Sequence, residues 1–100
     1  MTLEQVKELF QTTELQELCQ QNGVARLSVF GSTARNEATE QSDLDLLVSF
    51  SKTLGLWEFI VFEDKLAAAT QQKVDLVMEG SLKGRRGESI QRDLQMIYAP

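Results

Sequence analysis

Apolar residues recur at helical spacing in the first part of the chain. Leu3, Val6 and Phe10 fall on one helical face, behind the capping-box spacing of Thr2 and Gln5. The pattern breaks near residues 11–13, resumes in a shifted register over residues 15–19, and stops at the Asn-Gly pair of residues 22 and 23. These positions predict two short helices separated by a break.

Three later segments are typical of strands. They are Val24–Phe30, Asp43–Phe50 and Lys73–Met78, rich in β-branched and other apolar residues. Between them, the sequence predicts a helical turn at Thr33–Asn36, a polar loop through Ser42, and a longer helix over Gly55–Gln72. A last helix is expected from about Arg86 to Ile97, burying Ile90, Leu94 and Ile97. This order favours an α/β (α+β) fold, a small mixed sheet of about three strands with helices packed on it. The first two strands would be antiparallel, with the third a parallel neighbour.

Composition narrows the possible functions. With 100 residues, 42% of them apolar, we expect one domain over residues 1–100. The balance of 15 acidic and 10 basic residues gives a net charge of −5, which argues against general nucleic-acid binding. The absence of histidine excludes Ser-His-Asp and Cys-His catalysis and ordinary zinc sites. A single cysteine, no signal-peptide pattern and no apolar run long enough for a bilayer predict a cytoplasmic protein without a membrane partner.

Two aspartates stand at the head of the second predicted strand. Side chains alternate along a strand, so Asp43 and Asp45 face the same side, about 6.5–7 Å apart. Carboxylate oxygens suit magnesium, and a pair of magnesium ions about 3.5–4 Å apart is a common device for phosphoryl transfer. Taken alone, the two acids fit a solvent-exposed strand end better than a metal site.

Asp75 interrupts the apolar run of the third predicted strand. If that strand lies beside the second, Asp75 converges on Asp43 and Asp45 and completes a metal site of three acids. The alternatives are an ion pair with Lys73 or exposure on an edge strand.

The segment after the first predicted strand has the composition of a phosphate-binding turn. Gly31 lets the backbone approach a ligand closely, and Ser32 adds a hydroxyl donor, although Ser32 could equally cap the helical turn that follows. Arg35 could contact a phosphate or pair with an acid of the loop.

Two further groups have open roles. The basic residues Lys83, Arg85 and Arg86 fit a solvated helix start, or contact with a triphosphate or an acidic partner surface. The aromatic residues of the longer helix, which are Trp57, Phe59 and Phe62, are expected in the core, with an interface as the alternative.

Together, these motifs resemble a known family. The run GSTAR at residues 31–35, followed after seven residues by DLDLLV at 43–48, resembles the signature of the minimal nucleotidyltransferases (MNT), small members of the DNA polymerase β-like superfamily. The segment KVDLV at 73–77 looks like the strand that carries the family's third carboxylate. One departure is Asn36, where the family commonly has glycine.

The resemblance implies both a reaction and a partner. Asp43 and Asp45 would bind magnesium, two ions in all, with Asp75 as the third acid near the attacking hydroxyl, while Gly31 and Ser32 would hold the phosphates of ATP. Chains of this size resemble the antitoxins of HEPN/MNT toxin–antitoxin pairs, which transfer AMP from ATP to a tyrosine of the HEPN ribonuclease toxin.

Two other functions remain open. The chain could neutralise its partner by stoichiometric masking, with the acids structural, or it could modify a small molecule, as aminoglycoside nucleotidyltransferases do. The latter resemble longer chains with an added substrate domain, so transfer to a small molecule ranks last.

Overall fold

The centre of the fold is a four-stranded sheet with the order β3-β2-β1-β4, seen in a computed structural model that describes residues 1–81 and 84–100. The strands are β1 (Val24–Phe30), β2 (Leu44–Phe50), β3 (Val74–Met78) and β4 (Gln95–Tyr98). The helices are α1 (Leu3–Leu9), α2 (Thr13–Gln21), α3 (Gly31–Ala34), α4 (Leu56–Thr70) and α5 (Gly84–Asp93), with a 3-10 turn, η1 (Glu79–Ser81). The predicted mixed α/β class is confirmed.

Strand directions follow from the lengths of the connections. β1 and β2 pair antiparallel, whereas β2 and β3 pair parallel with α4 as the crossover between them. Both directions agree with the prediction. The parallel pair places Asp45 of β2 in register with Asp75 of β3.

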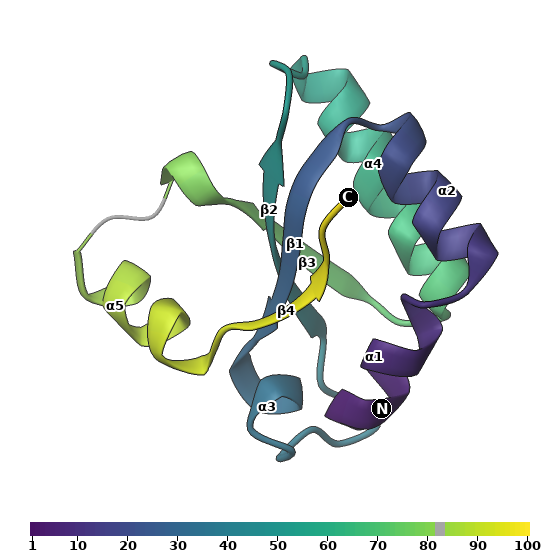
Figure 1. Cartoon of the computed structure of the whole chain (residues 1–100). Helices are drawn as coiled ribbons and strands as arrows, with labels where there is room; N and C mark the ends of the chain where they lie inside the picture. The colour runs from purple at the N-terminus through teal and green to yellow at the C-terminus, as the bar shows by residue number, and fades with distance from the viewer. Residues whose placement is uncertain (82–83) are drawn as a thin grey trace.

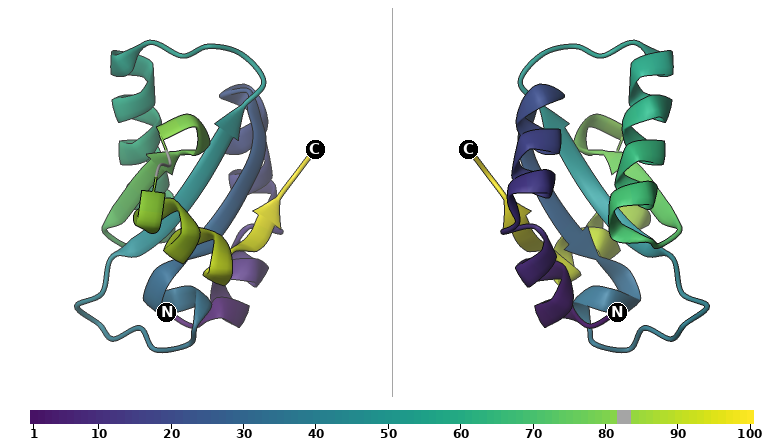
Figure 2. Two further views of the ribbon diagram at one scale, coloured as in Figure 1. Left: turned by 90° about the vertical axis from the view of Figure 1, so that its left-hand side faces the viewer. Right: turned by 90° about the vertical axis from the view of Figure 1, so that its right-hand side faces the viewer.

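Helices cover the two faces of the sheet unequally (Figures 1 and 2). α1, α2 and α4 lie on one face and α5 on the other, while α3 lies at the end of β1. The main core lies under the three helices and includes Phe10, Leu27, Leu46, Phe62 and Leu66. A smaller cluster of Phe30, Leu47 and Ile90 lies under α5.

The predicted helix starts at the N-terminus are confirmed. The Thr2 N–H donates to Gln5 Oε1 at 2.8 Å and the Gln5 N–H donates to Thr2 Oγ1 at 3.1 Å, which completes a capping box. The break before α2 is held by Thr12, whose hydroxyl accepts from the Leu15 N–H at 3.5 Å. Over the described ranges, no helix combines the length and apolar character needed to cross a membrane.

The prediction for the last helix is wrong at its C-terminal end. α5 stops at Asp93, and Gln95–Tyr98 forms β4, which pairs antiparallel with β1. The spacing of Ile90, Leu94 and Ile97 suits a helix, but pairing supplies hydrogen-bond partners to the other edge of β1 and still buries Ile97. The sheet therefore has one strand more than expected.

The aromatic residues of α4 are divided between core and surface. Phe62 is fully buried and Phe59 packs edge-on against Phe50, with ring centroids 6.3 Å apart, but Trp57 is 75% exposed. The expectation that all three aromatic residues lie in the core is therefore wrong for Trp57. The basic group of Lys83, Arg85 and Arg86 lies outside the residues whose side chains the structure describes.

Candidate active site

The turn from β1 into α3 brings the backbone against a carboxylate. Gly31 has φ = 71°, in the left-handed region that favours glycine. A β-carbon at Gly31 would collide with Oδ2 of Asp45. The conformation and the contact therefore both require glycine, and together they place the turn directly beside an acid of β2.

Ser32 lies in the first turn of α3, not ahead of it. The helix begins at Gly31, and Phe30 is its N-cap residue without a side-chain cap bond. The alternative that Ser32 caps this turn is therefore wrong. Its predicted role as a donor to nucleotide phosphates stays a prediction.

Asp45 and Asp75 lie side by side on neighbouring strands. They are register partners in the parallel pair, where strands run about 4.8 Å apart. Asp43 immediately precedes β2, and its place on the same side as Asp45 stays a prediction. The expectation that the third strand lies beside the second is confirmed. Of the alternatives for Asp75, exposure on an edge strand agrees with the structure, since β3 is at the sheet edge and Asp75 is exposed.

The face of the sheet explains how strands tolerate these acids. Alternate residues of β2, such as Leu44 and Leu46, are buried in the main core. Asp45 therefore points to the opposite face, where Leu47 is the next residue and belongs to the cluster under α5. The acids lie beyond that cluster, toward the α3 end of the sheet, so their charges stay out of the core.

The donors at this end of the sheet fit magnesium. The acids offer hard oxygen ligands from two adjacent strands, and Gly31 leaves the Asp45 carboxylate unobstructed by a β-carbon. Within residues 1–81 and 84–100, no three acidic, cysteine or histidine side chains are gathered into a ready-made cage. Magnesium commonly takes only one or two carboxylates, with water and substrate phosphates completing its shell, so the arrangement suits an ion that arrives with a nucleotide.

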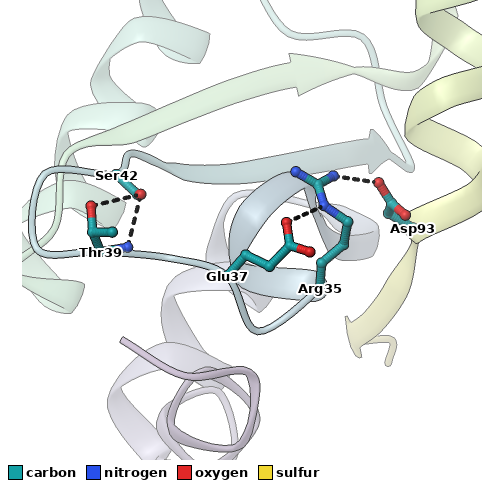
Figure 3. Close-up of polar contacts among 5 residues, drawn as sticks. All are labelled: Arg35, Glu37, Thr39, Ser42 and Asp93. Atoms are coloured by element: carbon teal, nitrogen blue, oxygen red, sulfur yellow. Dashed lines mark hydrogen bonds and ion pairs between the residues drawn. The ribbon is translucent and has the colours of Figure 1, made fainter.

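Arg35 links the turn to α5 (Figure 3). Its Nη1 lies 2.7 Å from Oδ2 of Asp93, and its Nε lies 3.2 Å from Oε2 of Glu37. The hydrogen bonds to Asp93 and then to Glu37 raise the pKa of the Arg35 guanidinium. Two roles were predicted for Arg35, contact with a phosphate or an ion pair with an acid of the loop. The structure shows the ion pair, formed with Glu37. Contact of Arg35 with a phosphate stays a prediction. Asp93 was missed at the sequence level, because it is far along the chain and carries no motif.

The loop between α3 and β2 is held by short polar contacts. Ser42 Oγ accepts from the Thr39 N–H at 3.0 Å, which closes a turn just before Asp43 (Figure 3). Asn36 has φ = 59°, and its Oδ1 accepts from the Leu3 N–H at 3.1 Å. Asparagine tolerates this left-handed conformation, so the departure from glycine keeps the backbone path and adds a tie to α1.

Comparison with known proteins decides the family. A model of the nucleotidyltransferase domain matches residues 13–97. The chain belongs to the nucleotidyltransferase domain family. Its fold is thus that of a nucleotidyltransferase, and the resemblance seen in the sequence is confirmed.

Relatives of this nucleotidyltransferase cover nearly its whole length. Protein adenylyltransferase MntA of Thermococcus cleftensis is 39% identical over 97 residues, which is 97% of each chain. A solved structure of a minimal nucleotidyltransferase has a TM-score of 0.77 and 36% identity, covering 95% of both chains. The MNT antitoxin complex with the tri-AMPylated HEPN toxin of Shewanella oneidensis gives a match with a TM-score of 0.68 and 19% identity, covering 99% of this chain and 74% of that one. At 19% identity, this match shows the fold alone.

Proposed function

We propose that this nucleotidyltransferase transfers AMP from ATP to a tyrosine hydroxyl of a partner HEPN toxin and thereby acts as an antitoxin. The observation that carries the proposal is the register of Asp45 with Asp75, beside a turn in which Gly31 lies against the Asp45 carboxylate. The 39% identity to a protein adenylyltransferase supports a protein as the acceptor. A reducing cytoplasm would suit the buried free thiol of Cys19.

The reaction uses residue types that the site holds. The acceptor oxygen attacks the α-phosphorus of ATP, the bond to the leaving pyrophosphate breaks, and the hydroxyl proton passes to the carboxylate of Asp75. The turn at Gly31 and Ser32 would hold the phosphates through backbone N–H groups and a hydroxyl. Catalysis is then mainly positioning and charge neutralisation, for which no histidine is needed.

Asp43, Asp45 and Asp75 would hold the magnesium. When bound, two magnesium ions would neutralise the charge that develops on the triphosphate. Because β2 and β3 are paired, Asp45 and Asp75 stay about one strand spacing apart. Little reorganisation of these two side chains is then needed when the nucleotide binds.

Transfer is tested with purified chain, ATP, magnesium and the toxin, using mass spectrometry of the toxin. We expect a mass gain of one or more AMP units on a toxin tyrosine with the wild-type chain. Asp45→Asn should abolish that gain, because it removes a ligand charge. The matched control is Asp64→Asn, which changes an exposed acid on α4 away from the site and should transfer like the wild type. No mass gain with the wild-type chain, or an unchanged gain with Asp45→Asn, would refute the proposal.

Growth of cells that express the toxin separates catalysis from masking. Under the proposal, Asp45→Asn still forms the complex but no longer neutralises the toxin. Full neutralisation by Asp45→Asn would instead favour stoichiometric masking.

A further inference from the structure

Exposed apolar side chains gather at one edge of the sheet. Among the described residues, five large apolar side chains are exposed, and four of them belong to the start of α4 or to the edge strand β3. Leu56 is 77% exposed and Trp57 75% exposed, while Ile60 and Met78 are less so. The fifth, Met96, lies on the opposite edge strand, β4. On a surface that contacts only water, polar residues would be expected in these positions.

A groove runs between the start of α4 and β3, which lie next to each other at the sheet edge (Figure 2). We call it the edge groove. It has a volume of about 480 Å³. Its lining includes Leu54, Leu56, Phe59, Val77, Met78 and Asp75. Among the residues that the structure describes, Asp75 is the one charged residue of the lining, which is otherwise mainly apolar.

Two backbone groups on the outer edge of β3 are bonded to side chains of the same chain. The Leu76 N–H donates to Oε2 of Glu63 on α4 at 2.9 Å, and the Met78 carbonyl accepts from Ser81 Oγ at 2.8 Å. Both groups point away from β2 and would otherwise offer hydrogen bonds to an added strand. These two groups are therefore not open to an added strand.

The acid in the edge groove is the third acid of the candidate active site. Asp75 lies in register with Asp45 and, in the proposed function, takes the proton of the acceptor hydroxyl. An acceptor must bring its hydroxyl to this carboxylate, and Asp75 contributes to the lining of the edge groove. Apolar walls with one acid are complementary to an aromatic hydroxyl side chain, which has an apolar body and a polar tip. The described part of the lining offers no second acid to a polycationic small-molecule acceptor.

We propose that the edge groove binds the segment of the partner protein that carries the acceptor hydroxyl. Leu56 and Met78 would hold the apolar part of the segment, while the hydroxyl lies at Asp75. Ile60 and Trp57 would extend the contact along the outer side of α4, since they follow Leu56 around the helix at about 100° per residue. This inference rests on the proposed function and adds the site at which the partner is recognised.

Kinetics with isosteric polar substitutions test the edge groove. The double variant Leu56→Asn/Met78→Gln keeps the length of each side chain but removes apolar surface. We expect its KM for the toxin to rise about tenfold or more, with kcat and the KM for ATP unchanged. Met96→Gln makes the same change at the exposed methionine of the opposite edge and should behave like the wild type. An unchanged toxin KM in the double variant, an equal rise in Met96→Gln, or a matching rise in the KM for ATP would overturn the inference.

Trp57 offers a readout that does not depend on catalysis. It is the one tryptophan of the sequence, so a chain labelled with 5-fluorotryptophan has a single ¹⁹F resonance. In the Asp45→Asn background, toxin should shift this resonance, and the double variant should need more toxin for the same shift. A resonance that does not move at saturating toxin would overturn the edge groove. Failure of the wild-type chain to transfer AMP would instead overturn the proposed function.

Discussion

Gly31→Ala should impair transfer far more than it impairs folding. The substitution places a side chain at φ = 71° and directs its β-carbon into Oδ2 of Asp45. The left-handed conformation costs about 1–2 kcal/mol for a residue with a β-carbon. Loss of glycine's freedom in the unfolded chain offsets about 0.4–1 kcal/mol of this. The net loss in the free energy of unfolding is therefore about 1 kcal/mol, which lowers Tm by about 4–8 °C in a domain of this size.

The effect of Gly31→Ala on catalysis comes from displacement of the Asp45 carboxylate. Asp45 must move to admit the new methyl group, and a misplacement of about 1 Å in a catalytic site can cost about 100-fold in rate. We expect AMP transfer by Gly31→Ala to fall by about that factor at a temperature where the variant is fully folded.

Gly23→Ala is the matched control. Gly23 has φ = 69°, but an added β-carbon there would meet the flexible side chain of Lys52, with Cε at 3.0 Å. This variant should lose similar stability in urea unfolding and keep its transfer rate. Transfer by Gly31→Ala within about threefold of wild type, or an equal loss of transfer in Gly23→Ala, would show that the contact with Asp45 does not matter for the reaction.

Three further predictions concern stability. Burial raises the pKa of the Cys19 thiol from 9.0 to about 12. The unfolded chain loses this proton at lower pH than the folded chain. The free energy of unfolding should therefore fall above pH 9, by about 1.4 kcal/mol at pH 10, and urea unfolding of Cys19→Ala should lack this part of the fall. The Arg35–Asp93 pair is on the surface, so Asp93→Asn should cost less stability than Gly31→Ala, and a loss that does not shrink in added salt would contradict the ion pair. Asn36→Ala should lower Tm more than Asn36→Gly, since both lose the bond to the Leu3 N–H but only alanine strains the backbone; equal Tm values would contradict this reasoning.

The last strand shows where sequence reasoning failed. Ile90, Leu94 and Ile97 have helical spacing, and nothing local distinguishes a continued helix from a helix followed by a strand. The unpaired edge of β1 decided the outcome, because β4 supplies its hydrogen-bond partners. Trp57 is exposed because it lies about 140–180° around α4 from the buried Phe62 and Leu66, at about 100° per residue.

The sequence by itself determined the local elements and the residue types of the site. Glycine at position 31 and aspartates at 43, 45 and 75 could be singled out, because strands seldom carry charges and turns need particular backbone angles. Only the tertiary structure decided that β3 pairs with β2 in the register that sets Asp75 beside Asp45, and that the Gly31 turn lies against the same carboxylate. The reason is physical: strand register depends on which faces are buried by distant helices, and no short stretch of sequence contains that information.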